Sequence, residues 1–178
     1  MVYLMLAPGF EEVEALTPLD YLRRVGQEVK LVGVSSQIVT GAHGITVHCD
    51  TVVEELDTLP DLLILPGGMP GTRNLERNAY VAKQIEACYW GEKMIAAICA
   101  APSILGHMSL LEGKKATCYP GFESELQGAE VLPDPVVRDG RIITAKGAGV
   151  ANQFAFAIVE ALCGKEEAET LKAAIQWQ

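Results

Sequence analysis

Ile95-Ala96-Ala97-Ile98-Cys99-Ala100-Ala101-Pro102 is an apolar stretch of strand character that runs into one cysteine, two small residues and a proline. Proline is tolerated in the first turn of a helix, because the N–H that it lacks has no helical partner there. The stretch therefore predicts a strand, a sharp turn and a helix, with Cys99 at the corner. Such a corner needs small neighbours, since the turning backbone leaves no room for large side chains.

Short apolar segments alternate with helical segments along the rest of the chain. The segments of strand character lie at 2–6, 29–34, 62–65 and 94–98, and the helical ones at 11–25, 78–89, 149–163 and 166–175. This alternation predicts an α/β fold with a doubly wound, mostly parallel sheet and helices on both faces. We expect one domain over residues 1–178, because the chain is too short for two comfortable domains and has no linker.

Two local signals modify this pattern. Pro18 lies inside the first helical segment, which is therefore either one helix kinked at Pro18 or a turn followed by a new helix that Thr17 caps. Asp139-Gly140 separates the strand-like segments 136–138 and 141–144, and this dipeptide is a strong signal for a β-hairpin.

The composition argues against several classes of function. The chain has 178 residues and a net charge of -9, which disfavours binding to nucleic acid or to an anionic membrane. No apolar stretch is long enough to span a bilayer, and the apolar N-terminal segment lacks the basic flank of a signal peptide. The five cysteines are scattered and include no C-x-x-C pair, so we expect free thiols and a cytoplasmic location.

The loops that follow the predicted strands carry the residues of greatest chemical interest. In a doubly wound sheet, ligands bind beyond the carboxyl ends of the strands, where this chain has the loops 7–14, 66–71, 99–102 and 144–149. Cys99 lies in the third loop, next to the start of a helix, where a thiolate is favoured over a thiol. We therefore expect a thiol pKa well below the roughly 8.5 of a free cysteine.

A cysteine nucleophile also needs donors for a developing oxyanion and a partner that handles a proton. The N–H groups of Ala100 and of Gly67 and Gly68 are candidate donors, although Pro-Gly-Gly is more often a plain turn. The three histidines are His43, His48 and His107. None follows Cys99 directly, and no cluster of His, Cys, Asp or Glu has metal-ligand spacing, so we expect no metal or other cofactor.

A carboxylate is the remaining candidate for the proton partner. Glu11 and Glu14 lie three residues apart, hence on one face of a helix, just past the first strand. Acidic residues also favour the first turn of any helix, which is the simpler reason for their presence. A carboxylate beside a thiolate raises the pKa of both groups, so the pair works only if the carboxyl is protonated and donates a hydrogen bond to sulfur.

Several segments, read in order, resemble the ThiJ/PfpI superfamily and most closely its DJ-one clade of parkinsonism-associated deglycases. The matching segments are Gly9-Phe10-Glu11-Glu12-Val13-Glu14-Ala15, Leu65-Pro66-Gly67-Gly68, Ala96-Ala97-Ile98-Cys99-Ala100-Ala101-Pro102, Asp139-Gly140-Arg141-Ile142-Ile143-Thr144 and Ile158-Val159-Glu160-Ala161-Leu162 with Gly164-Lys165. The resemblance implies a flavodoxin-like fold, a homodimer, and cofactor-free chemistry on reactive carbonyls such as methylglyoxal or on the adducts that they form with protein.

The same resemblance assigns roles to individual residues. Cys99 matches the family's oxidisable nucleophile, and Glu14 matches the protonated glutamate that hydrogen-bonds its sulfur. The expected oxyanion and substrate-binding residues are Gly67, Gly68, Ala100 and Tyr119.

The chain departs from the family pattern at four positions. Ala100 follows the cysteine where the peptidase-like branches have a histidine, so a Cys-His dyad is missing. Tyr119 stands where the clade often has a pocket histidine, Ala148 where proline is common, and His43 where arginine is common. These departures bear on substrate choice and on rate.

Three functions remain open from the sequence. The first is a cysteine-dependent, cofactor-free glyoxalase or deglycase. The second is a redox sensor or redox-regulated chaperone, in which oxidation of Cys99 to a sulfinic acid is the event and Glu14 stabilises the product. A cysteine peptidase or amidase is the third, and the missing histidine weakens it.

Overall fold

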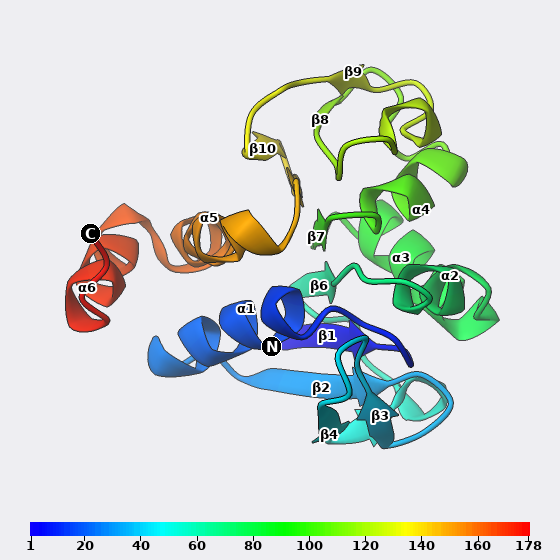
Figure 1. Cartoon of the computed structure of the whole chain (residues 1–178), viewed down its shortest axis with the longest axis horizontal. Helices are drawn as coiled ribbons and strands as arrows, with labels where there is room; N and C mark the ends of the chain where they lie inside the picture. Colours follow the sequence, from blue (N-terminus) through cyan, green and yellow to red (C-terminus); the bar gives the residue numbers. More distant parts are fainter.

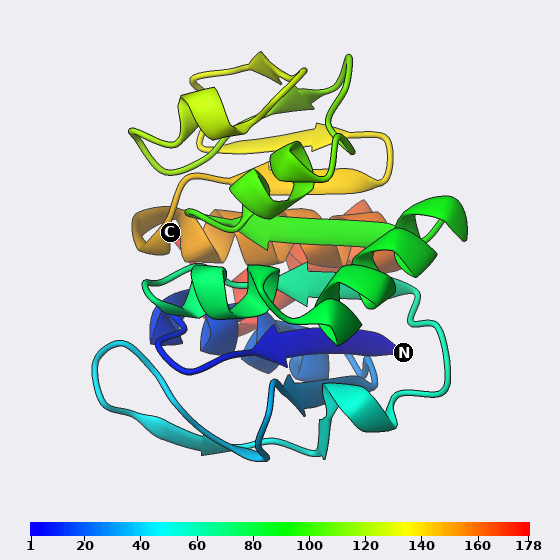
Figure 2. The ribbon, with the colours of Figure 1, turned by 90° about the vertical axis from the view of Figure 1, so that its right-hand side faces the viewer.

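A seven-stranded sheet forms the centre of the molecule, and the computed structural model describes all of residues 1–178. The strands are β1 (Val2–Leu6), β2 (Val29–Gly33), β5 (Thr51–Val52), β6 (Leu62–Leu65), β7 (Met94–Ile98), β10 (Val136–Asp139) and β11 (Ile142–Ala145). They lie in the order β10-β11-β7-β6-β1-β2-β5, and every neighbouring pair is parallel except β10 and β11 (Figure 2). The predicted doubly wound, mostly parallel sheet is confirmed.

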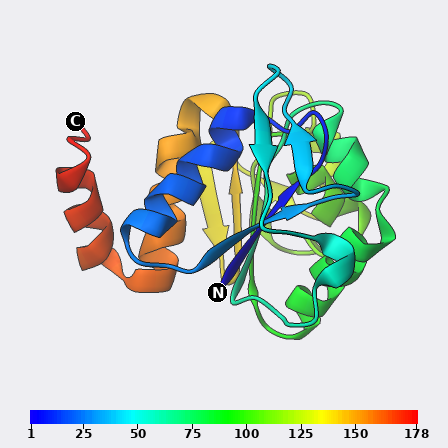
Figure 3. The ribbon, with the colours of Figure 1, turned by 90° about the horizontal axis from the view of Figure 1, so that it is seen from below.

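Helices cover both faces of this sheet (Figures 1 and 3). One face carries α1 (Glu12–Arg24) and α5 (Ala151–Cys163), with α6 (Lys165–Ala174) packed on the outer side of α5. The other face carries α2 (Gly71–Glu76), α3 (Ala79–Trp90) and α4 (Pro102–His107). None of these helices combines the length and the apolar character that crossing a membrane requires.

Smaller elements complete the chain. They are the antiparallel pair β3 (Ile38–Thr40) and β4 (Thr46–His48), the parallel pair β8 (Lys115–Ala116) and β9 (Glu130–Val131), and the 3-10 turns η1 (Val53–Glu55), η2 (Glu123–Glu125) and η3 (Ala148–Val150).

The side chains of β1 show why its sequence is apolar throughout. Val2, Leu4 and Leu6 belong to the core cluster under α1 and α5, whereas Tyr3 and Met5 belong to the cluster on the opposite face. All five are at most 1% exposed. A strand buried on both faces reads as a continuous apolar run rather than as an alternation.

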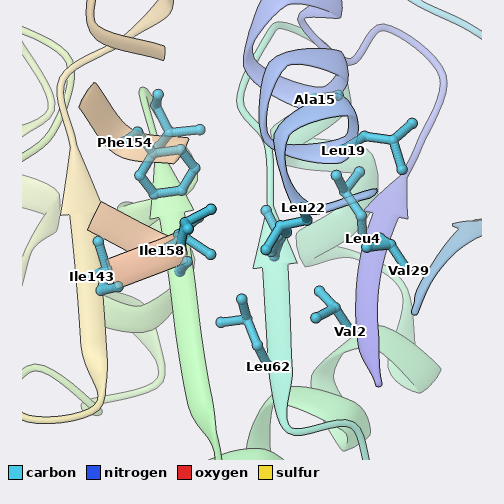
Figure 4. Packing of buried hydrophobic residues seen from close by; sticks show 14 of the residues in the cluster. Val2, Leu4, Ala15, Leu19, Leu22, Val29, Leu62, Ile143, Phe154 and Ile158 are labelled. Atoms are coloured by element: carbon cyan, nitrogen blue, oxygen red, sulfur yellow. The ribbon is translucent and has the colours of Figure 1, made fainter. Parts of the chain in front are cut away.

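Figure 4 shows how the helices of the first face meet the sheet. Leu19 and Leu22 of α1 lie over the strands that carry Leu4 and Leu62, and Phe154 and Ile158 of α5 lie over β7 and β11. The amphipathic spacing of α1 thus places its apolar stripe on the sheet, and the first turn of the same helix reaches the carboxyl end of β1.

Two expectations need correction in detail. α1 is one continuous helix through Pro18, so the alternative of a turn followed by a new helix is wrong. The missing N–H of Pro18 leaves the carbonyl of Glu14 without its helical partner. The hairpin is confirmed, but Asp139 pairs with Ile142, so its turn lies one residue later than expected.

The four loops expected at the site meet at the point where the strand order reverses. β2 lies on one side of β1 and β6 on the other, which opens a crevice beyond their carboxyl ends. The N–H of Glu11 donates to the carbonyl of Gly67 at 2.9 Å, and the N–H of Cys99 donates to that of Ala145 at 2.9 Å. The first bond joins the loops after β1 and β6, and the second joins the loop after β7 to the end of β11.

We predict that Leu22→Ala lowers the free energy of unfolding by about 2–5 kcal/mol, because Leu22 is fully buried between α1 and the sheet. Leu59→Ala is the matched control, since Leu59 is 41% exposed and loses much less contact area. Urea unfolding curves compare the two variants. Equal losses would contradict this description of the core.

Candidate active site

Cys99 occupies the corner between β7 and α4. Its φ is 65°, in the left-handed region, which is uncommon for a residue with a side chain. The backbone is held on both sides, because the N–H of Cys99 donates to Ala145 and the N–H of Tyr119 donates to the carbonyl of Cys99 at 2.9 Å. Such a conformation costs about 1–3 kcal/mol and persists where the surroundings fix it. The predicted nucleophile elbow is therefore present.

Two backbone donors face the sulfur of Cys99. They are the N–H groups of Gly68 and Ala100, and both favour the thiolate. Helix α4 has only six residues, so its dipole is weak and these local donors dominate. Their convergence on one atom matches the expected geometry for holding an anion next to sulfur.

Glu14 brings a carboxyl group to the same sulfur. Its side chain projects from the first turn of α1, is 1% exposed, and makes a hydrogen bond with Cys99. The N–H of Gly67 donates to Glu14 Oε2 at 2.9 Å, and the N–H of Ala148 also donates to this carboxyl. Three loops therefore orient one carboxyl, as buried polar groups require.

Gly67 makes the close approach of Glu14 and Cys99 possible. A Cβ at this position would lie 2.5 Å from the Cβ of Cys99 and 2.7 Å from Oε2 of Glu14, so any larger residue would push one of them away. The N–H of Gly67 is already engaged by Glu14. Gly67 thus positions Glu14, whereas of the two glycines only Gly68 donates to the sulfur.

The thiol pKa of Cys99 differs from the low value that its place between a strand and a helix predicted. Burial raises the pKa of the Glu14 carboxyl to about 7. Burial, and after it the negative charge of Glu14, raises the pKa of the Cys99 thiol to about 12. That expectation is therefore wrong for a site in which Glu14 is ionised.

The two groups act as one titrating unit. Because each negative charge opposes the other, the pair holds a single proton between about pH 7 and about pH 12. If the carboxyl keeps that proton, Cys99 carries the charge as a thiolate and Glu14 donates a hydrogen bond to it.

The backbone of Tyr119 contacts the Cys99 carbonyl, and its side chain is 50% exposed. A Cβ built on Gly147 would lie 3.2 Å from the Tyr119 ring and 3.6 Å from Glu14 Oε1, so Gly147 separates the ring from the carboxyl. The ring therefore lies near the Glu14 carboxyl, and the expected role of Tyr119 in substrate binding stays a prediction.

The histidines lie away from the sulfur. His107 ends α4, and its two ring nitrogens contact Glu76 and Glu125. His43 Nδ1 lies 2.9 Å from Glu12 Oε2, which ties the hairpin of β3 and β4 to α1. His48 lies on β4 and pairs with Ile38 of β3. None of the three histidines is therefore placed as a base for Cys99.

One grouping has no counterpart in the sequence prediction. The ligand atoms of Glu11, Glu12 and His43 lie within 4.8 Å of one another, a separation that suits a metal ion. Glu12 already accepts the N–H groups of His43 and Ile45 as well as the contact with the imidazole. The Glu12 carboxylate therefore already has hydrogen-bond partners within the protein, and these bonds link α1 to the hairpin of β3 and β4.

Ala148 is the residue that sequence reasoning undervalued. A proline at this position, common in the family pattern, has no N–H, whereas Ala148 donates one to Glu14. This donor favours the ionised carboxylate and so lowers the pKa of Glu14 against the opposing effect of burial. The sequence shows Ala148 as a departure from the family pattern, but only the structure shows that its N–H faces Glu14.

We predict that Ala148→Pro raises the pKa of Glu14, because it removes an N–H that favours the ionised carboxylate. Ala148 opens η3 and follows extended backbone at Gly147, a place that accepts proline. The carboxyl ¹³C shift of Glu14 is followed against pH in a Cys99→Ala background, where the thiol no longer couples to it. Ala148→Gly keeps the N–H and is the control, and an unchanged titration in Ala148→Pro would contradict the assignment.

Comparison with known proteins identifies the family of the chain. The model of the DJ-1/PfpI family matches residues 1–161. Protein DJ-1 homolog B of Arabidopsis thaliana is 39% identical over 171 residues, which are 94% of this chain and 39% of that protein. The chain thus spans about two fifths of the length of this relative. A Pyrococcus abyssi protein named as a deglycase is 31% identical over 151 residues, 83% of this chain and 90% of that protein.

Solved structures give the same result. A mutant of a DJ-1 superfamily protein from Salmonella typhimurium superimposes with a TM-score of 0.96 at 31% identity, covering 99% of this chain and 98% of the other. Oxidized DJ-1 from Toxoplasma gondii gives a TM-score of 0.94 at 32% identity, covering 99% and 97%. The flavodoxin-like fold is therefore confirmed, and the chain belongs to the DJ-1/PfpI family.

Proposed function

We propose that the protein is a cofactor-free glyoxalase or deglycase that acts on methylglyoxal-type carbonyls or their adducts. One observation carries the proposal: the Cys99 sulfur, a buried Glu14 carboxyl and the N–H groups of Gly68 and Ala100 converge at one point. These are the nucleophile, proton carrier and oxyanion donors that carbonyl addition needs. The relative named as a deglycase supports the same chemistry.

The proposed reaction starts when the Cys99 thiolate adds to the aldehyde carbon of methylglyoxal. A C–S bond forms, and the C=O pair moves to oxygen, where the amides of Gly68 and Ala100 stabilise the alkoxide. Glu14 then gives its proton to that oxygen and becomes a carboxylate. The product of this step is a hemithioacetal on Cys99.

Glu14 next isomerises the adduct, so that the former aldehyde carbon reaches the oxidation level of an acid and the neighbouring ketone carbon becomes an alcohol. Its carboxylate removes the proton from the former aldehyde carbon, which gives an enediolate, and then delivers this proton to the neighbouring carbon. The hydroxyl proton of the hemithioacetal passes at the same time to the oxygen of that neighbouring carbon. The resulting lactoyl thioester reacts with water, which releases lactate and restores the thiol. Tyr119, whose ring lies near Glu14, contacts the entering carbonyl compound.

We predict slow conversion of methylglyoxal to lactate by the pure protein without glutathione or added metal. Cys99→Ala, Cys99→Ser and Glu14→Gln should each lower turnover at least about a hundredfold, because each removes the nucleophile or the proton carrier. Lactate is measured enzymatically after timed incubation. Glu11→Gln is the matched control and should keep most activity, and wild-type turnover in Cys99→Ala would exclude this function.

A redox-sensing function is the second candidate, because the same donors suit an oxidised sulfur. Peroxide would convert the thiolate to a sulfenate and water, and a second peroxide would give the sulfinate. The amides of Gly68 and Ala100 and a protonated Glu14 are placed to hydrogen-bond its oxygens. Clean sulfinic acid formation at Cys99 without any methylglyoxal turnover would favour this candidate. A cysteine peptidase needs a histidine base beside its nucleophile, and Cys99 has none.

We further propose a homodimer in a reducing compartment such as the cytoplasm, where the five free thiols would persist. An apolar patch suits a second copy of the chain. Val13 and Ile45 are 49% and 51% exposed, and with Leu16 they line a hollow of about 360 Å³ beside the first turn of α1. Covering this patch would bury exposed apolar area next to Glu14.

We predict that Val13→Glu combined with Ile45→Glu converts the dimer to a monomer, because two charges would be buried in the contact. Light scattering at micromolar concentration measures the mass. Ile38→Glu is the control, since Ile38 is 62% exposed and lies outside the hollow. A wild-type protein that is only monomeric would refute the dimer.

A further inference from the structure

A second cavity lies at the opposite edge of the sheet from Cys99. It has a volume of about 420 Å³ and lies at the amino ends of β7 and β11, next to the end of α3. The residues that give it chemical character are Tyr89, Trp90, Glu92, Lys93, Lys114 and Arg141. None of them contributes to the site around Cys99, so this cavity needs a separate explanation.

Trp90 presents an unusually large apolar surface at this cavity. Its side chain is 76% exposed, the highest value among the large hydrophobic residues of the chain. The indole meets the Tyr89 ring edge-on, with centroids 5.1 Å apart and an interplanar angle of 89°. Tyr89 packs on the core beneath α3, so it limits the freedom of the indole. A flat aromatic surface of this kind suits stacking against a planar ligand.

Basic groups gather at the same cavity although the chain as a whole is acidic. Lys93 Nζ lies 2.9 Å from Asp61, but Asp61 also holds the terminal ammonium group at 2.9 Å. Arg141 lies 3.2 Å from Glu92 on the exposed rim.

Lys114 is half-buried and takes no part in the ion pairs of the structure. Its N–H donates to Leu111 and its carbonyl accepts the N–H of Glu130, so the backbone that carries the ammonium is fixed. An ammonium without an ionic partner, inside a protein of net charge -9, marks a place where an anion is favoured.

We propose that this cavity binds a small planar anion, whose ring stacks on Trp90 and whose phosphate or carboxylate is held by Lys114 and Arg141. The two features act together: the ring gains contact with the indole, and the acidic group neutralises the unpaired ammonium. Arg141 can donate to the ligand through its remaining guanidinium N–H groups while it keeps its contact with Glu92. The cavity is separate from the chemistry at Cys99 and stands whether or not the proposed activity is correct.

Fluorescence of Trp90 tests the proposal directly. The full chain carries Trp177→Phe, so that Trp90 is the remaining tryptophan. It is titrated with adenosine monophosphate and with naphthoate, which offer a ring with a phosphate or a carboxylate, and with adenosine and inorganic phosphate, which each lack one half. We expect saturable quenching by at least one of the two ring-containing anions, and binding at least about tenfold weaker for adenosine and for phosphate.

Matched variants assign the contacts. Lys114→Gln should weaken binding of the anion about tenfold, whereas Lys115→Gln, which removes the same charge from the neighbouring exposed residue, should leave it unchanged. Cys99→Ala should bind as well as the parent, which separates this site from the catalytic one. No saturable quenching by either anion, or equal effects of Lys114→Gln and Lys115→Gln, would overturn the proposal.

Discussion

Two acidic groups buried against each other, the Glu14 carboxyl and the Cys99 thiol, constrain the chemistry of this protein. Water is largely excluded from the carboxyl, so two adjacent negative charges are strongly disfavoured and the pair retains one proton from about pH 7 to about pH 12. Two pairs of backbone N–H groups act on the two acids. Gly68 and Ala100 donate to the sulfur, whereas Gly67 and Ala148 donate to the carboxyl. Their balance decides which atom holds the proton, and hence whether the sulfur is a nucleophile.

The fold supplies this balance through loops that share one edge of the sheet. β1 leads to Glu14, β6 to the two glycines, β7 to Cys99 and β11 to Ala148. The left-handed backbone of Cys99 and the absent side chain of Gly67 bring these loops into contact. The proposed glyoxalase and sensor functions use the same arrangement and differ in whether a carbonyl carbon or a peroxide oxygen meets the sulfur.

Much of this arrangement was predictable from the sequence, for physical reasons. Continuous apolar strands between helical segments specify a doubly wound sheet, and Cys99 before two alanines and Pro102 specifies the elbow. The division of labour between Gly67 and Gly68 was not predictable, because it depends on the direction of single N–H groups. The raised thiol pKa depends on burial depth, and the contact of Glu11 and Glu12 with His43 depends on how a hairpin folds back; neither leaves a pattern in the sequence.

The location of the shared proton is the central claim, and one pH titration measures it. Ultraviolet absorbance reports the Cys99 thiolate, and the carboxyl ¹³C shift reports the protonation of Glu14 in the same wild-type sample. The account predicts that the proton lost by the pair near pH 7 comes from sulfur, so that the thiolate signal appears there while Glu14 remains protonated, and that Glu14→Gln leaves a reactive thiol. An ionised Glu14 beside a neutral thiol over that range would contradict it.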